Sequence, residues 1–400
     1  MHSTVGLSAL RSEISLEPAE LSLGRGIKVK NYSFTSQGHT LLEKTGSGQG
    51  ALKTGPTFAE PDFYSLYHLP DLAVDENRCF RYHLMLPEDK EKADKLIFLL
   101  HGFNERSWSK YLPWAAQLVK RTGHGVLLFP LAFHMNRAPK LWNNARAMRK
   151  VSSERQSLYP DLLQSTLSNA AISIRLHANP ARFFWSGLVS YYDILDLVRT
   201  IRESRHPGID PMAPVSFFAY SIGTLLSEIV LFTDEDGLFS DSRLVAFCGG
   251  PVFNRLSPVT KFILDSEADV QLYSFLVEHL DSHRRTDPEL DRYLSDSMPV
   301  GRNFRCLLNY RLDRLYREAR FKALADRILA LALAQDEVVP PYEIIGTFQG
   351  SRRDIGIRVE VIDLPYRYRH EDPFPPAGPG KTEADEQMDR VFKMAADFLA

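Results

Sequence analysis

The chain has 400 residues, of which 44% are hydrophobic and 24% charged, so it carries enough apolar material for a substantial core. Its 48 Lys and Arg residues against 50 Asp and Glu residues leave a net charge of −2. This charge gives no electrostatic attraction to nucleic acid or to an anionic membrane, and neither is expected as a partner.

The first part of the chain, residues 1–77, shows little hydrophobic periodicity. The stretch from Thr35 to Thr57 is rich in Gly, Ser and Thr. We interpret residues 1–77 as an N-terminal extension made of loops. The opening residues lack a basic segment followed by a sustained apolar run, which argues against a secretory signal.

Residues 78–400 have a different pattern, in which short apolar runs alternate with segments of helical period. This alternation is typical of βαβ units around a mostly parallel sheet. The run 95–101 is apolar almost throughout, as expected for a strand that is buried on both faces. Strands are predicted at 80–86, 95–101, 125–130, 215–220, 244–248, 328–333 and 357–362, and helices at 114–120, 188–202, 225–231 and 385–399.

Two connections, at about 132–182 and 249–326, are too long to be simple loops of a compact domain. We therefore predict that one α/β domain over residues 78–400 carries two inserted substructures, the second of them mostly helical. Ligands of open α/β sheets bind outside the carboxyl ends of the strands, so insertions there would cover a site and set its selectivity.

A serine stands where a predicted strand meets a predicted helix. Ser221 has Ala219 and Gly223 two positions away on either side. Small residues at these positions let the strand and helix backbones approach closely, as a tight turn with an exposed hydroxyl requires. The pattern indicates a nucleophile elbow in which Ala219 replaces the more common glycine.

Other candidate residues also follow predicted strands. His101-Gly102 ends an early strand, where the next backbone N–H could be an oxyanion donor or the glycine could simply make a turn. Asp336 follows the strand 328–333 and could orient a histidine or cap the next helix, with Glu337 as the rival acid. Of twelve histidines, only His370 comes after Asp336, and it lies in the loop after the last predicted strand.

The order Ser221, Asp336, His370 resembles the α/β-hydrolase superfamily over roughly residues 78–400. The resemblance implies a mostly parallel twisted sheet flanked by helices, here with helical cap-like insertions. It also implies a serine hydrolase with Ser221 as nucleophile, His370 as base and Asp336 as orienting acid. The backbone N–H groups of Phe103 and Ile222 would form the oxyanion hole. We expect a small-molecule substrate with an ester-like bond, and no cofactor or metal.

Two further functions fit the same residues or the same fold. An acyltransferase would use the same triad but pass the acyl group to an alcohol or amine in place of water. A non-catalytic protein of this fold would bind a ligand or partner without reacting, and the presence of Ser221, Asp336 and His370 together argues against it. The substrate and the oligomeric state stay open.

The remaining sequence features favour ordinary structural roles. The longest charge-free stretch, between Asp210 and Glu228, contains two prolines and several Ser and Thr, so no membrane span is expected. His279 and His283 are interpreted as a solvated helix face. The segment from Ala132 to Arg155 contains six basic residues and one acidic residue, Glu154. These basic residues could bind an anionic substrate, but we favour the interpretation that they form a solvated surface. The basic residues are Arg137, Lys140, Arg146, Arg149, Lys150 and Arg155.

The three cysteines, Cys79, Cys248 and Cys306, lie far apart in the sequence and form neither a disulfide framework nor a paired metal-binding motif. They fit a reducing compartment better than a secreted protein. We therefore expect a cytoplasmic location.

Overall fold

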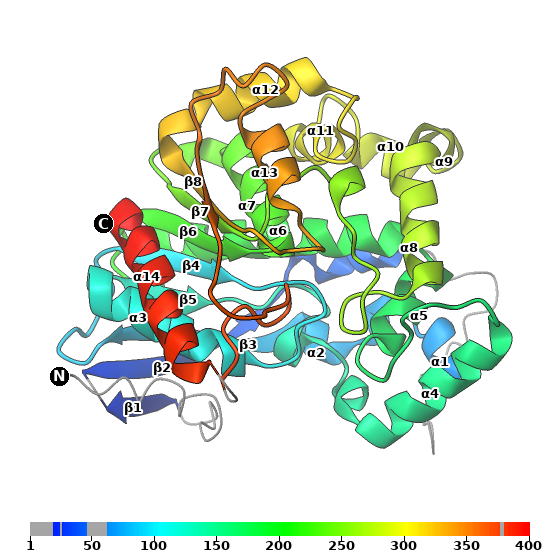
Figure 1. Ribbon diagram of the computed structural model, residues 1–400, viewed down its shortest axis with the longest axis horizontal. Coiled ribbons are helices and arrows are strands. Elements are labelled where there is room, and N and C mark those ends of the chain that lie inside the picture. The colour runs from blue at the N-terminus through cyan, green and yellow to red at the C-terminus, as the bar shows by residue number, and fades with distance from the viewer. Residues whose placement is uncertain (1–18, 25, 46–61, 377–379) are drawn as a thin grey trace.

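The computed structural model describes residues 19–24, 26–45, 62–376 and 380–400 (Figure 1). In this part of the chain nine strands form one sheet in the order β1-β2-β3-β5-β4-β6-β7-β8-β9. The strands from β5 to β9 in this order pair in parallel, whereas β1, β2 and β3 add antiparallel pairs at one edge. The bounds are β1 Glu20–Gly24, β2 Ile27–Thr35, β3 Cys79–Pro87, β4 Leu96–Leu100, β5 Gly125–Leu128, β6 Val215–Tyr220, β7 Leu244–Phe247, β8 Ile328–Leu333 and β9 Arg358–Ile362.

All seven predicted strands are confirmed, and the predicted bounds of β6 and β8 match at both ends. Every residue of β4 and β8 is buried, because helices cover both faces of the sheet. Alternate residues serve different faces. Phe98 belongs to one apolar cluster and its neighbour Leu99 to another. The mostly parallel sheet flanked by helices is the α/β-hydrolase fold.

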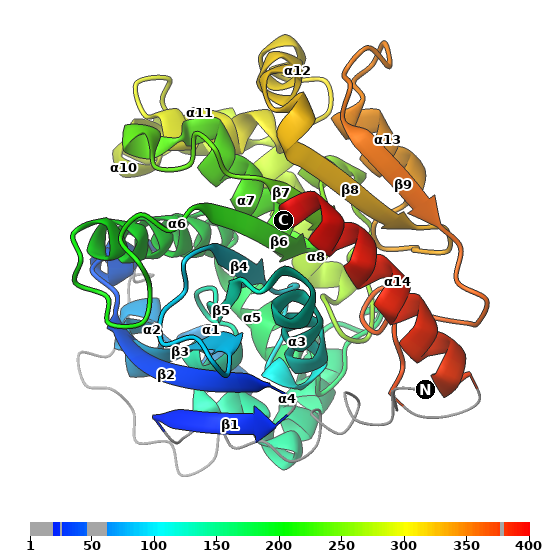
Figure 2. The same cartoon turned by 90° about the vertical axis from the view of Figure 1, so that its left-hand side faces the viewer.

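Long helices supply the two covering layers. The helices α3 (Tyr111–Thr122) and α14 (Lys381–Leu399) pack on the face that includes Leu99. The helices α6 (Ala181–Arg202) and α7 (Ile222–Thr233) pack on the opposite face, as Figure 2 shows. The four predicted helices are confirmed, each extending a few residues beyond its predicted bounds. A shorter helix, α13 (Pro341–Phe348), follows β8.

The two long connections are helical cap-like insertions (Figure 1). Their helices pack against one another, and Arg155 of the first makes two hydrogen bonds of 2.6 and 2.8 Å to Asp265 of the second. The first insertion holds η6 (Met135–Arg137), η7 (Lys140–Asn143), α4 (Ala145–Leu158) and α5 (Ala170–Ala178). The second holds η9 (Phe253–Arg255), α8 (Ser266–Tyr273), η10 (Ser274–Glu278), α9 (Leu280–Thr286), α10 (Pro288–Tyr293), α11 (Pro299–Cys306), α12 (Arg314–Ala323) and η11 (Ala325–Arg327).

Two of the six basic residues do not belong to a solvated surface, so the favoured interpretation is wrong for them. Arg155 is fully buried against Asp265, and Arg137 is fully buried 2.8 Å from Asp193. A guanidinium can be buried in this way because a carboxylate and backbone carbonyls satisfy its donors. Neither side chain is free to bind an anionic substrate.

The expectation of loops in the N-terminal part is wrong for residues 20–24 and 27–35. These residues form β1 and β2, and β2 pairs along its whole length with β3. Strand β2 was missed because its apolar residues do not keep a single alternation, since Ile27 and Val29 fall on one face whereas Tyr32 and Phe34 fall on the other. Residues 36–78 hold η3 (Gly38–Thr45), α1 (Phe63–Tyr67), η4 (Asp71–Ala73) and α2 (Asp75–Arg78).

Part of the Gly-, Ser- and Thr-rich stretch, residues 46–57, lies outside the described residues. A domain boundary between residues 77 and 78 stays a prediction.

Candidate active site

Ser221 occupies a sharp turn between β6 and α7. Its backbone has φ 54° and ψ −119°, a strained conformation for a residue with a side chain. The turn brings α7 so close to β4 that a Cβ on Gly223 would lie 2.9 Å from the Leu100 carbonyl oxygen and 3.0 Å from that of His101. Gly223 is therefore required at this position. Ala219, on the other side of the turn, is fully buried and its methyl group is accommodated.

His370 and Asp336 complete a hydrogen-bonded chain with Ser221. The Nε2 atom of His370 lies 2.9 Å from Ser221 Oγ, and its Nδ1 atom lies 2.7 Å from Asp336 Oδ2. Since the carboxylate can only accept, Nδ1 carries the proton and Nε2 accepts from the serine hydroxyl. Both His370 and Asp336 are 4% exposed, whereas Ser221 is half-buried and reachable.

The position of Asp336 is set by backbone donors. Its other oxygen, Oδ1, accepts the N–H groups of Val338 and Val339 at 3.0 and 2.9 Å. These bonds leave Oδ2 aimed at His370 and hold the carboxylate in one orientation. The rival acid Glu337 is exposed and takes no part in the chain.

The loop that carries His370 packs against residues that no sequence pattern identified. The Tyr220 ring stacks on the His370 ring at 5.3 Å with an interplanar angle of 17°, and its hydroxyl donates to the His370 carbonyl oxygen. Lys110 Nζ donates to the Glu371 carbonyl oxygen at 2.9 Å and also pairs with Glu105. No local pattern marks these contacts, because Lys110, Tyr220 and Glu371 come from distant parts of the chain.

The turn after β4 is held by a buried tyrosine. The Gly102 N–H donates to Tyr111 Oη at 2.9 Å, and that hydroxyl donates to Glu105 Oε1 at 2.9 Å. His101 points inward, where its Nε2 accepts the Leu131 N–H at 3.0 Å. Burial lowers the pKa of His101 well below its usual range, so its imidazole is neutral and structural.

The two predicted oxyanion donors lie beside Ser221 in the fold. Phe103 follows the Gly102 turn, and Ile222 is the first residue of α7. An N–H in the first turn of a helix has no hydrogen-bond partner within the helix and lies at the positive end of the helix dipole. Both side chains line the apolar pockets next to the serine. That their backbone N–H groups form an oxyanion hole stays a prediction.

Two apolar pockets adjoin this site. The serine pocket is lined by Ser221, by the turn at Gly249–Pro251 and by apolar side chains of the second insertion. The distal pocket lies between α6, α7, α5 and α11. Phe103, Phe183, Ile222 and Leu225 line both pockets.

Phe103 also lines a third hollow, the polar groove. Its lining includes Arg106, Glu105 and the neighbours of His370 on both sides, Arg369 and Glu371. The groove is polar where the two pockets are apolar.

Among the described residues, no group of three or more His, Cys, Asp or Glu side chains is arranged to hold a metal ion. His279 is exposed but lies between η10 and α9, and His283 in α9 is half-buried with its ring 4.4 Å from that of Phe275. The prediction that the two histidines share one solvated helix face is therefore wrong. The three cysteines are not joined in disulfides. None of the helices in the described ranges is long and apolar enough to span a membrane.

Comparison with protein families places the chain. Residues 19–400 match the model of the Family of unknown function (DUF6051), and the chain belongs to this family. No curated protein sequence matches it.

Solved structures with a similar fold are esterases. The esterase from Pyrobaculum calidifontis is 11% identical with a TM-score of 0.46 over 99% of this chain and 90% of its own. A thermostable esterase from Pseudomonas putida is 10% identical, with a TM-score of 0.45 over 99% and 89%. Carboxyl esterase 2 from Tuber melanosporum is 12% identical, with a TM-score of 0.44 over 80% and 81%.

Proposed function

We propose that this member of the family is a serine hydrolase that cleaves an ester-like bond of a small or medium-sized substrate. The observation that carries the proposal is the continuous hydrogen-bond chain from Ser221 through His370 to Asp336. A nucleophile, a base within hydrogen-bonding reach and a group that orients the base together form the arrangement used for acyl transfer. The strained backbone of Ser221 is a further indication, because strain of this kind persists mainly at functional sites.

In this mechanism His370 Nε2 takes the Ser221 proton while Oγ attacks the carbonyl carbon of the substrate. Asp336 holds the ring in the correct tautomer and stabilises the imidazolium. The N–H groups of Phe103 and Ile222 stabilise the negative oxygen of the tetrahedral intermediate. In comparable enzymes the loss of one such donor costs about 3–4 kcal/mol.

The intermediate collapses when His370 returns its proton to the leaving alcohol, and an acyl-enzyme on Ser221 remains. A water molecule deprotonated by His370 then attacks the acyl-enzyme and releases the acid. Each proton that leaves Ser221 or water passes through Nε2, the atom that lies 2.9 Å from Oγ. That distance also argues against a non-catalytic protein, which would need no histidine in reach of Ser221.

We also propose that the protein works in the cytoplasm on a small molecule. Support comes from the free thiols of Cys79, Cys248 and Cys306, of which Cys79 is exposed and would be open to oxidation in an oxidising compartment.

The test is covalent labelling with a fluorophosphonate probe. Wild type should be labelled, Ser221→Ala should not, and turnover of an ester in Ser221→Ala or His370→Ala should fall by about 10⁴- to 10⁶-fold. Ser227→Ala is the matched control, because Ser227 lies on the same helix and its hydroxyl donates to the Gly223 carbonyl oxygen. Labelling that survives in Ser221→Ala, or wild type that folds but is never labelled, would refute the assignment.

A further inference from the structure

We propose that the substrate is an ester of a long, uncharged, apolar acyl chain with a polar alcohol, and that the acyl chain extends from the serine pocket into the distal pocket. The proposal rests on the proposed function and names the substrate class of the same site. It follows from the chemistry of the two pockets, from the place of His370, and from one glycine in the wall of the distal pocket.

The position of His370 assigns the two sides of the substrate. Its proton must reach the leaving alcohol, so the alcohol lies on the side of the His370 loop. Arg369 and Glu371, the neighbours of His370, line the polar groove, whereas neither lines either apolar pocket. The alcohol therefore faces the polar groove, and the acyl group faces the apolar pockets.

The two apolar pockets share two aromatic side chains, Phe103 and Phe183. Phe183 lines both, and its ring centroid lies 6.3 Å from Phe103, 5.5 Å from Phe253 and 6.4 Å from Phe304. Phe183 is only half-buried, so it can turn without opening a well-packed core. An acyl chain that fills the serine pocket would pass this ring to enter the distal pocket.

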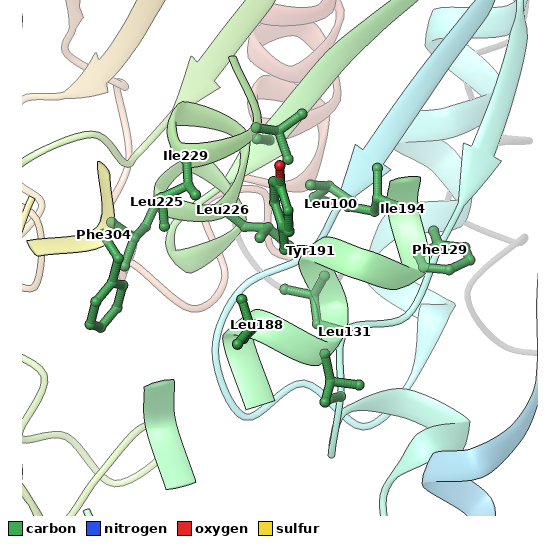
Figure 3. Packing of buried hydrophobic residues seen from close by; sticks show 14 of the residues in the cluster. Leu100, Phe129, Leu131, Leu188, Tyr191, Ile194, Leu225, Leu226, Ile229 and Phe304 are labelled. Atoms are coloured by element: carbon green, nitrogen blue, oxygen red, sulfur yellow. The ribbon is translucent and has the colours of Figure 1, made fainter. Parts of the chain in front are cut away.

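The distal pocket has apolar walls contributed by several separate segments. Figure 3 shows Leu131, Leu188, Leu226 and Phe304 gathered from the loop after β5, from α6, from α7 and from α11. Both insertions contribute, since Ile172 belongs to the first and Phe304 to the second. Burial of a methylene group against such walls is favourable by about 0.8 kcal/mol, which corresponds to about a fourfold gain in binding.

Arg175 and Ser190, two polar residues in the wall of the distal pocket, are paired with neighbouring protein groups. Arg175 donates to both Asp71 oxygens at 3.0 and 2.6 Å and to Ser186 Oγ at 2.6 Å. Ser190 Oγ donates to the Ser186 carbonyl oxygen at 2.9 Å and accepts the Ala132 N–H at 2.9 Å. Among the described residues, the lining contains no Asp or Glu, and the Arg175 charge is paired with Asp71, so a charged end of a ligand would find no ion partner here and would lose its hydration. The pocket therefore selects an uncharged chain.

Two further ionisable residues, His134 and Tyr191, line this wall, and the buried Nε2 atom of His134 has no hydrogen-bond partner among the described residues. Tyr191 Oη donates to Glu235 Oε2 at 3.3 Å. The Nδ1–H of His134 donates to the Ala132 carbonyl oxygen at 2.8 Å, and the His134 ring packs edge-on against Phe103 at 5.2 Å. Burial lowers the pKa of His134 to about 3, so it adds no charge to the pocket at neutral pH.

Gly187 gives a direct way to test the distal pocket. It lies in α6, lines the pocket, and a Cβ built on it meets no atom within 4 Å. A leucine at this position would occupy the space that we assign to the far end of the acyl chain. Gly356→Leu is the matched control, because it adds the same side chain at a glycine that, like Gly187, is exposed but lines none of the three hollows.

The experiment measures kcat/KM for p-nitrophenyl esters from acetate to dodecanoate. In wild type we expect a rise of about fourfold per added methylene until the pockets are full. Gly187→Leu should lose at least tenfold with the longest esters that wild type accepts and stay within twofold with acetate and butyrate. Gly356→Leu should follow the wild-type profile, and Gly187→Ala should lose less activity with the longest esters than Gly187→Leu.

Two results would overturn the inference while leaving the hydrolase itself intact. One is a flat chain-length profile, or an equal loss with acetate and long esters in Gly187→Leu. The other is a profile that depends on alkyl alcohol length at fixed acyl length, with Gly187→Leu removing that dependence. Fluorophosphonate labelling of every variant keeps the cases apart, since absence of labelling in wild type refutes the hydrolase and not the pocket assignment.

Discussion

The tight contact at Gly223 gives the sharpest test of how the fold presents Ser221. We consider the change Gly223→Ala, which adds one methyl group at the second residue of α7. That Cβ would lie 2.9 Å from both Leu100 Cβ and the Leu100 carbonyl oxygen, and 3.0 Å from the His101 carbonyl oxygen. Contacts this short are with backbone or with the first side-chain atom, so the strand and the helix must move apart.

The expected cost follows from overpacking. Extra volume in a well-packed core costs about 1–3 kcal/mol, and a clash with backbone belongs at the upper end. Alanine is a better helix residue than glycine by up to about 1 kcal/mol, which offsets part of the cost. We therefore expect Gly223→Ala to lower the free energy of unfolding by about 2 kcal/mol.

Gly187→Ala is the matched comparison, because it makes the same substitution inside α6 where the new Cβ meets nothing within 4 Å. That variant should gain about 0.5–1 kcal/mol, so the two variants should differ by about 3 kcal/mol. Urea unfolding followed by circular dichroism measures the difference.

Activity should follow the same order. Separation of α7 from the β4 turn moves the Ile222 N–H away from Phe103, so the rate of fluorophosphonate labelling should fall at least tenfold in Gly223→Ala and stay unchanged in Gly187→Ala. Equal unfolding midpoints and equal labelling rates in the two variants would refute the claim that close packing positions the serine.

Three further predictions concern charged groups. Asp336→Asn should reduce kcat by about 10⁴-fold because the histidine loses its correct tautomer, while Glu337→Gln should stay near wild type; ester kinetics on both variants decide between the two acids. Burial raises the pKa of Glu228 well above its usual range, and neither oxygen has a hydrogen-bond partner within the described residues. The folded protein thus binds the Glu228 proton more tightly than the unfolded chain does. Free energy of unfolding is therefore lost as the pH rises above about 4.3, the pKa of a glutamate in the unfolded chain. Glu228→Gln should therefore raise the urea midpoint at pH 8 but not at pH 4, and an equal shift at both would contradict this. Arg137→Met leaves the buried carboxylate of Asp193 without its partner and should cost about 3–5 kcal/mol in unfolding free energy, partly recovered when Asp193→Asn is added.

The parallel part of the sheet could be predicted because each of its strands has a recognisable local sequence pattern. The run 328–333 is apolar at every position, and 215–220 is apolar at every position except Ser216, since helices cover both faces of the sheet. The antiparallel strand β2, which lies between β1 and β3, gave no such signal. Only part of it is buried, and its backbone is satisfied by pairing with residues about fifty positions away in the chain.

The candidate site divides in the same way. The sequence by itself determined which residues stand at the carboxyl ends of the strands, because Ser221, Asp336 and His370 each follow a strand directly or by a short loop. Only the tertiary structure decided the distances between them, the strained turn at Ser221 and the stacking of Tyr220 on His370. Those contacts join segments that are distant in the chain, and their energy depends on packing that no local pattern records.

The pockets depend on tertiary structure most of all. Their walls come from α5, α6, α7 and α11 together. In the sequence of any one of these helices, the same leucines and phenylalanines would be interpreted as ordinary core residues. Whether an apolar side chain fills space or borders it is decided by the facing helix, so the shape of the site was set only when the two insertions packed over the sheet.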